Sequence, residues 1–321
     1  MSSHDKVAGM IAAFAVGDAL GSPHELEYNR TGQYTGYIYI PCRIKSQWRG
    51  SRDSALGQLS DDTEMLLTLS KSLIKFHGYN KDEVIKDYLK WANGKIPFLG
   101  RNTKNLFKGV TTIKGYQKRY NEEIKKPMDQ WSQSNGGMMR SPPMALLSDF
   151  NLAMEDVKIT NFHPVSIDAN MIYISILWMI LRGYTKEQVI NHIKISGQTK
   201  EVKEVIEQAT DRKIRDLTKN KGHCLNSLHV AISALYFDNI QNFYDWVIQQ
   251  PDSDTDTNAA IGGAVIGAFL GYENLLKEEK MKYNLPLVLS CDTTKGDIPR
   301  PIEYSLHDFK ELTYELFKLT Q

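Results

Sequence analysis

The stretch DTDTNAAIGGAVIGAFLG, residues 254–271, does most to decide the fold. Behind its acidic start, much of the helix-patterned part is glycine or alanine, including Gly262, Gly263, Gly267 and Gly271. A glycine inside a helix costs about 1 kcal/mol relative to alanine, so this many need a structural reason. The usual reason is the close approach of another backbone. We therefore predict a helix here that packs tightly against a second helix.

The N-terminal segment Val7–Leu20 has the matching character. Its small residues are Ala8, Gly9, Ala12, Ala13, Ala15 and Gly17. Two helices with small side chains on their surfaces can approach each other closely, so we predict that these two pack together near the centre of the domain. That packing would hold Asp254 and Asp256 beside the loop that follows Gly17 and Asp18.

Apolar residues recur at helical spacing through most of the remaining chain. The further predicted helices are Thr63–Phe76, Lys81–Trp91, Met171–Leu181, Lys186–Ile195, Val202–Leu217, Ser227–Phe237, Phe243–Gln249, Ala259–Leu276 and His307–Leu319. Only Gln33–Ile40 alternates like a strand, and an irregular loop or an isolated hairpin arm is the competing interpretation. Since strands and helices do not alternate, we predict an all-α fold.

Nothing in the sequence divides the chain. There is no Gly/Ser-rich or Pro-rich linker and no internal repeat of the length found in solenoid proteins. The longest polar stretches, Tyr116–Ser134 and Lys282–Arg300, are predicted to be surface excursions from one compact domain. We therefore predict a single domain over residues 1–321.

The composition excludes several classes of protein. With 39 Lys and Arg against 38 Asp and Glu, the net charge gives no case for nucleic acid or an anionic membrane as a partner. Three dispersed cysteines without a CxxC argue against disulfides and zinc. The N-terminal residues MSSHDKVAGM lack the basic-then-apolar order of a signal peptide, so a soluble, cytoplasmic protein is expected. The histidines at 77, 192, 223, 229 and 307 lack ligand-like spacing and are expected on the surface or satisfied in the core.

Two acidic runs carry the chemistry that the residues themselves suggest. Ser60-Asp61-Asp62-Thr63 and Asp254-Thr255-Asp256-Thr257 each combine carboxylates with hydroxyls at the start of a helix. Oxygen ligands of this kind suit Mg²⁺, Mn²⁺ or Ca²⁺. The first run taken alone is better explained as a helix cap with acidic residues in the first turn. Both together predict a cation site that folding assembles.

Two further segments are candidates of lower specificity. Glu25 follows a Gly-Ser-Pro turn, and taken alone it would be an ordinary surface glutamate. Ser134-Asn135-Gly136-Gly137-Met138 offers close backbone approach and N–H groups suited to phosphate, although such a sequence is more often just a turn.

In order along the chain, four motifs resemble the ADP-ribosylglycohydrolase family. They are GMIAAFAVGDALGSPHE, LSDDTEM, SNGGMMRSPPMAL and DTDTNAAIGGAVIGAFLG, which span residues 9–271. The resemblance implies a single all-α domain whose central cleft holds two Mg²⁺ ions, with Mn²⁺ as a substitute. It also implies a monomer that acts on an ADP-ribosylated protein or a small ADP-ribose conjugate.

Position by position, the resemblance implies roles for individual residues. The metal ligands would be Ser60, Asp61, Asp62, Asp254, Asp256 and Thr257. Glu25 would be the catalytic acid or base. The substrate would be held by Ser134, Asn135, Gly136, Gly137 and Met138, and by Asn161 and His163.

The chain departs from the family pattern at three places. Asp252-Ser253 stands where relatives commonly have Gly-Gly before the second acidic run. Asn161 takes the place of a family histidine, with His163 two residues later. Phe98 replaces an aspartate found in some members. These departures fall on the side of the substrate, while the implied metal ligands are all present.

These features lead to one functional hypothesis and two alternatives. The hypothesis is metal-assisted hydrolysis of an N- or O-glycosidic bond of ADP-ribose. The first alternative is an inactive, ADP-ribose-binding or crystallin-like structural member of the family. The second is a metal-dependent phosphoesterase, which would release phosphate or AMP rather than ADP-ribose.

Overall fold

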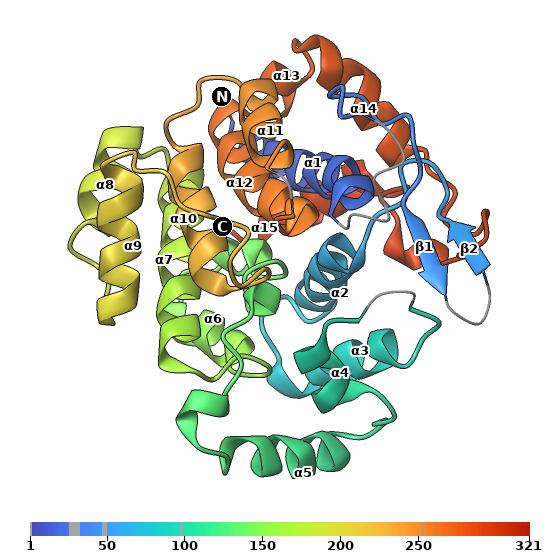
Figure 1. Ribbon diagram of the computed structural model, residues 1–321, viewed down its shortest axis with the longest axis vertical. Helices are drawn as coiled ribbons and strands as arrows, with labels where there is room; N and C mark the ends of the chain where they lie inside the picture. The colour runs from blue at the N-terminus through green and yellow to red at the C-terminus, as the bar shows by residue number, and fades with distance from the viewer. Residues whose placement is uncertain (1, 26–32, 47–49, 97–98, 251) are drawn as a thin grey trace.

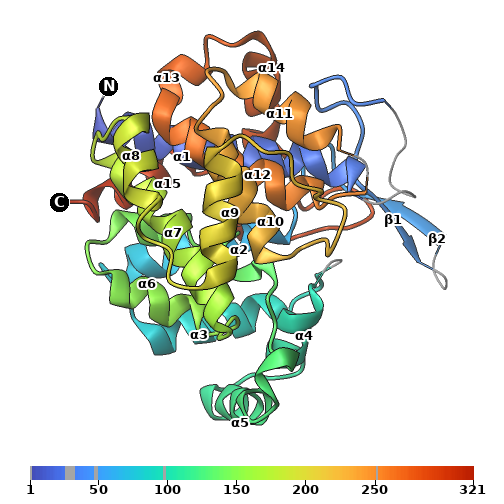
Figure 2. The same cartoon turned by 60° about the vertical axis from the view of Figure 1, so that its left-hand side comes forward.

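The computed structural model describes residues 2–25, 33–46, 50–96, 99–250 and 252–321. Over these residues the chain forms fifteen α-helices and one antiparallel ribbon, in which β1 (Arg43–Ser46) pairs with β2 (Gly50–Asp53). The helices form one rounded body, and the ribbon projects from its edge (Figures 1 and 2). The all-α fold predicted from the sequence is therefore confirmed.

Helices α1 (Ser3–Gly21) and α12 (Thr255–Leu270) form the centre of the molecule and run antiparallel. Glycines allow their backbones to touch. A Cβ at Gly9 would overlap the carbonyl oxygen of Gly267, and a Cβ at Gly17 would overlap that of Ala259. Both helices are buried on every side over most of their length, as expected for helices that are apolar all round. The predicted pairing is confirmed.

The remaining helices form shells around this pair. In contact with it lie α2 (Asp61–Lys75), α7 (Pro164–Leu181), α10 (Cys224–Ala234), α11 (Ile240–Ile248), α13 (Tyr272–Leu275), α14 (Glu279–Leu289) and α15 (Phe309–Lys318). Further out lie α3 (Lys81–Ala92), α4 (Arg101–Phe107), α5 (Ile113–Ile124), α6 (Phe150–Val157), α8 (Lys186–Ile193) and α9 (Lys200–Thr210). Although α7 is apolar and 18 residues long, 78% of it is buried inside the protein, the pattern of a core helix.

The structure differs from the sequence predictions at the periphery. Helices α4, α5, α6 and α14 were not predicted, and the polar stretches read as surface excursions contain most of α5 and most of α14. Helix α5 is mostly polar, and Tyr116 is its only buried residue. Helix α14 contains Pro286, and a proline inside a segment argues against predicting a helix there.

The strand-like segment Gln33–Ile40 is an irregular loop, so the competing interpretation was the right one. The side chain of Asn284 on α14 explains why. Its Oδ1 accepts the Ile38 N–H at 2.9 Å, and its Nδ2 donates to the Gly36 carbonyl at 2.8 Å. Backbone groups that a strand would pair with a neighbouring strand are bonded to a helix side chain instead.

Candidate active site

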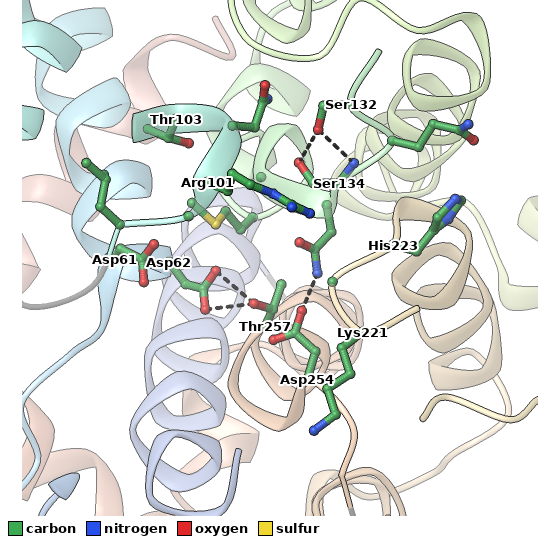
Figure 3. A pocket seen from close by; sticks show the side chains of 18 of the residues that line it. Asp61, Asp62, Arg101, Thr103, Ser132, Ser134, Lys221, His223, Asp254 and Thr257 are labelled. Atoms are coloured by element: carbon green, nitrogen blue, oxygen red, sulfur yellow. Dashed lines mark hydrogen bonds between the residues drawn. The ribbon is translucent and has the colours of Figure 1, made fainter. Parts of the chain in front are cut away.

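A deep cleft of about 1150 Å³ opens where the ends of α1, α2 and α12 meet the loops before η4 (Asn135–Gly137) and α10. Figure 3 shows side chains from these distant parts of the chain converging on it. The predicted site residues that line it are Glu25, Asp61, Asp62, Ser134, Asn135, Gly136, Asp254, Asp256 and Thr257. Folding therefore brings both acidic runs and the predicted substrate loop to one cavity.

The two acidic runs meet through a hydrogen bond. The Thr257 hydroxyl donates to the carboxylate of Asp62, at 3.1 Å from Oδ1 and 3.0 Å from Oδ2 (Figure 3). Ser60 caps α2 by accepting the Asp62 N–H, so the helix-cap interpretation of the first run also holds. The run serves both purposes because a cap directs its side-chain oxygens toward the end of the helix.

A carboxylate that the site prediction did not include, that of Asp18, lies beneath the first run. It is fully buried near the end of α1, and it accepts the backbone N–H groups of Ser60 at 3.1 Å and Thr63 at 3.2 Å. The available signal was a single acid in the otherwise apolar segment Val7–Leu20. Asp18 links α1 to α2, so it fixes the start of the first acidic run against the central helix pair.

The carboxylates form two adjacent groups that share one member. Oxygens of Asp18, Asp62 and Asp256 lie within 4.8 Å of one another, and so do oxygens of Glu25, Asp254 and Asp256. Since three carboxylates this close repel one another, each group needs protons or a cation. Asp256 lies in both groups, which places two candidate cation positions side by side.

Burial, followed by mutual repulsion, raises the pKa of these acids. The pKa of Asp61 rises to about 7 through burial and then through the charges of Asp18 and Glu64. Burial also raises the pKa of Glu25 to about 8, helped by Asp254 and Asp61. For Asp62, burial and then the Asp61 charge act in the same direction.

A divalent cation fits this donor set. Over the described ranges, no Lys or Arg nitrogen lies within 4.0 Å of a carboxylate oxygen of Asp18, Asp62 or Asp256. The two groups consist of carboxylates and include no thiolate or imidazole. Carboxylate oxygens are the ligands preferred by hard cations such as Mg²⁺ and Mn²⁺.

The substrate loop is tied to the second acidic run. The Asn135 side-chain amide donates to Asp254 at 2.7 Å and to the Ser227 hydroxyl at 3.0 Å. Its backbone N–H donates to the Gly222 carbonyl at 2.8 Å, beside a short β-bridge between Ser134 and His223. The loop is therefore bonded to Asp254 in the second acidic run and to the start of α10.

The rim of the cleft carries cations and aromatic rings. Arg101 and Lys221 approach from opposite sides (Figure 3), and Trp131 packs edge-on against Phe162 with ring centroids 5.1 Å apart. The sequence prediction did not include these four residues. They give the cleft a basic and aromatic rim above an acidic floor, which suits a ligand with an anionic part, a planar part and a polyhydroxyl part.

Comparison with known proteins identifies the family to which this arrangement belongs. The sequence profile of the ADP-ribosylglycohydrolase family matches residues 1–286. The chain belongs to the ADP-ribosylglycohydrolase family. This confirms the resemblance found in the motifs and, with it, the class of enzyme, hydrolases of glycosyl bonds.

Two characterised members of the ADP-ribosylglycohydrolase family align with most of the chain. An ADP-ribosylarginine hydrolase, Tri1, from Pseudomonas putida (strain GB-1) is 22% identical over 296 residues, 85% of this chain and 73% of that protein. The ADP-ribosyl-dinitrogen reductase glycohydrolase of Rhodospirillum rubrum is 23% identical over 289 residues, 85% of this chain and 88% of that one. A solved ADP-ribosylglycohydrolase-related protein complex has the same fold, with a TM-score of 0.71, 18% identity, and coverage of 100% of this chain and 99% of that one.

Five residues implied by the ADP-ribosylglycohydrolase resemblance lie outside the lining of the main cleft. These are Ser60, Gly137, Met138, Asn161 and His163. Asn161 lies behind the substrate loop, where its amide donates to the Ser134 carbonyl at 2.9 Å and hydroxyl at 3.1 Å. His163 caps α7 by accepting the Val165 N–H at 3.1 Å. Asn161 therefore supports the loop, and His163 caps the helix that follows it.

The other family departures have different outcomes. Ser253 is fully buried, and its hydroxyl donates to the Gln250 carbonyl at 3.1 Å, within the turn that enters the second run. Phe98 falls outside the described residues. His223 was expected on the surface or satisfied in the core; its ring accepts the Leu225 N–H at 3.2 Å, and it lines the cleft, which the sequence analysis did not foresee. Its position depends on the pairing with Ser134, which spacing along the chain does not reveal.

Proposed function

We propose that this protein hydrolyses the glycosidic bond between ADP-ribose and a protein side chain or a small conjugate, using two divalent cations, Mg²⁺ by preference and Mn²⁺ as a substitute. The observation that carries the proposal is the pair of carboxylate groups that share Asp256 on the floor of a large cleft. The aligned arginine-specific and dinitrogen reductase-specific hydrolases support ADP-ribose as the common substrate.

The two cation positions would use different ligands. One would take Asp62 and Asp256 together with Asp18, and the other would take Asp254 and Asp256, with the Glu25 carboxyl close beside them. Asp61 also lines the cleft. The hydroxyls of Ser60 and Thr257 both donate hydrogen bonds to the Asp62 carboxylate. When bound, such cations polarise ribose oxygens and activate a water.

Glu25 is the residue of this chain that we assign to proton transfer. It lines the cleft at the edge of the acidic floor, where a water or a leaving group could reach it. Its carboxyl would take the proton of the attacking water or supply one to the leaving group. The neighbouring carboxylates would stabilise the positive charge that develops at the anomeric carbon.

The rim would recognise the rest of ADP-ribose. Arg101 and Lys221 would attract the diphosphate, and the ring of Trp131, backed by the buried Phe162, would pack against the adenine. Backbone N–H groups of the loop at Ser134–Gly136 would contact the phosphates or ribose. We further propose that the protein acts as a single-domain monomer in the cytoplasm.

An assay of ADP-ribose release tests the proposal. Asp256→Asn removes the carboxylate common to both groups, so we expect turnover of an ADP-ribosylated arginine or serine peptide at saturating Mg²⁺ to fall by about a hundredfold or more. Asp168→Asn is the matched control, because Asp168 is a buried acid that caps the loop before α9 and lies outside the cleft.

The products separate the remaining hypotheses. Unchanged turnover in Asp256→Asn would contradict the metal-assisted mechanism. Release of phosphate or AMP in place of ADP-ribose would identify a phosphoesterase. Calorimetric binding of ADP-ribose without any product would identify an inactive, ADP-ribose-binding member of the family.

A further inference from the structure

Two arginines are buried on opposite sides of the cleft, each paired with a carboxylate that takes no part in the cation groups. We infer that they are positioning residues with separate tasks: Arg300 holds the metal-ligand run at Ser60–Asp62, and Arg140 holds the substrate loop at Ser134–Gly137. This inference rests on the proposed function. It gives the metal-ligand run and the substrate loop a separate buried arginine each.

Arg300 reaches α2 through Glu64. Its Nε donates to Glu64 Oε1 at 2.7 Å and its Nη2 to Oε2 at 2.6 Å, with the two side chains 1% and 4% exposed. The Trp91 indole donates to the same carboxylate at 2.7 Å. A two-point contact fixes the rotation of Glu64 as well as its position. Glu64 lies in the first turn of α2, where its N–H donates to the Ser60 carbonyl at 3.2 Å.

The segment before Arg300 holds the other flank of the same run. The Gln58 side chain donates to the Ile298 carbonyl at 3.1 Å, and the Asp297 N–H donates to the Asp53 carbonyl at 3.1 Å. The run Ser60–Asp62 is thus attached at residue 58 on one side and residue 64 on the other. Both attachments lead to residues 298–300, which lie beyond the part of the chain that the family profile matches, residues 1–286.

Arg140 grips the substrate loop directly. Its Nη1 donates to the Gly136 carbonyl at 2.9 Å and to the Thr160 hydroxyl at 2.7 Å. Its Nε donates to Asp156 Oδ2 at 3.0 Å, and both side chains are fully buried. The Tyr88 hydroxyl donates to the other oxygen of Asp156 at 3.0 Å. Arg140 therefore connects the loop to the rigid helices α3 and α6.

A second path from Arg140 ends at the same loop. The Thr160 hydroxyl, which accepts from Arg140, donates to the Asn161 Oδ1 at 2.7 Å. The Asn161 amide then donates to the Ser134 carbonyl at 2.9 Å. Asn161 therefore links Thr160 to Ser134, because a side-chain amide can accept one hydrogen bond and donate another at the same time.

Binding measurements on two variants separate the tasks. We expect Arg300→Met to weaken Mn²⁺ binding in calorimetry by about tenfold or more, as is usual when support behind a metal ligand is lost. Its KM at saturating Mn²⁺ should stay near that of the unaltered protein. We expect Arg140→Met to leave Mn²⁺ binding nearly unchanged and to weaken ADP-ribose binding about tenfold.

Paired variants and a control guard against general destabilisation. In Glu64→Gln/Arg300→Met and Asp156→Asn/Arg140→Met no carboxylate is left unpaired, so folding recovers while the respective binding defect remains. Lys71→Met is the matched control, since Lys71 joins α2 to the Glu303 carbonyl and Asp308 well away from the acidic run. It should leave Mn²⁺ binding unchanged.

The proposed function and this inference fail in different ways. An unaltered protein that binds Mn²⁺ and ADP-ribose but releases no product would overturn hydrolysis and still allow the test. Equal losses of Mn²⁺ and ADP-ribose binding in both variants, or normal binding in both folded proteins, would overturn the division of tasks between Arg300 and Arg140.

Discussion

Buried carboxylates occur both on the floor of the cleft and in the frame behind it, which consists of the Arg300–Glu64 and Arg140–Asp156 pairs, but their surroundings differ. Glu64 and Asp156 are deeply buried carboxylates, and each has its own arginine. Asp62 and Asp256 are buried as well, yet among the residues that the structure describes no Lys or Arg pairs with them. A buried acid with a built-in cation contributes to the frame, whereas a buried acid without one indicates a ligand from outside.

This contrast predicts opposite responses to equivalent substitutions. Asp156→Asn should give the largest effect, because it leaves Arg140 buried with its charge uncompensated. We expect a loss of about 3–5 kcal/mol in the free energy of unfolding, measured by urea denaturation. A loss below about 1 kcal/mol would show that Arg140 finds other partners and that the frame does not depend on the pair.

Asp62→Asn should reverse that pattern on the floor of the cleft. Turnover should fall by about a hundredfold, since a cation ligand is lost. The stability of the metal-free protein should hold or rise, because one of several mutually repelling acids has gone. Urea denaturation in EDTA measures the stability. A large loss of stability with turnover retained would place Asp62 in the frame.

The pH dependence of stability should expose the same repulsion. Burial raises the pKa of Asp61 from 3.8 to about 7 and that of Glu25 from 4.5 to about 8. Between these limits the folded protein binds more protons than the unfolded chain, so its stability falls as pH rises from about 4 to about 8. Melting temperatures in EDTA across this range should decline by several degrees, and Mg²⁺ should reduce the decline. A rise with pH would contradict the prediction.

Thr257→Val should give the smallest effect of the four. It removes the hydroxyl that joins the two acidic runs through Asp62 but leaves every carboxylate in place. We expect turnover to fall by about tenfold, which corresponds to one hydrogen bond to a charged group. Thr68→Val on α2 is the control, since its hydroxyl donates to the Glu64 carbonyl outside the cleft. Equal effects of both variants would remove Thr257 from the site.

The parts of the structure that could be predicted are those that produce a local pattern in the sequence. The helices α1 and α12 could be predicted because each contains glycines that indicate close contact with another backbone. The contact of Gly9 with Gly267 is one example. The acidic runs were recognisable for a similar reason, since hydroxyls and carboxylates at a helix start are adjacent in the chain.

The missing parts depend on contacts between distant segments. Asp18 belongs to the site because it accepts N–H groups from Ser60 and Thr63, which no spacing within α1 reveals. His223 reaches the cleft through its pairing with Ser134. Helix α5 is mostly polar and buries only Tyr116, so most of it was read as a surface excursion.

The contact between α1 and α12 also sets when the site can exist during synthesis. The first helix of the chain ends at Gly21 and its partner begins at Thr255, so over two hundred residues must be made before the two can meet. A nascent chain on the ribosome therefore carries Asp18 and Asp62 long before Asp256 is available to complete either carboxylate group. Contacts so distant in sequence form late and slowly. Cation binding would thus report that the start of α12 has reached the end of α1.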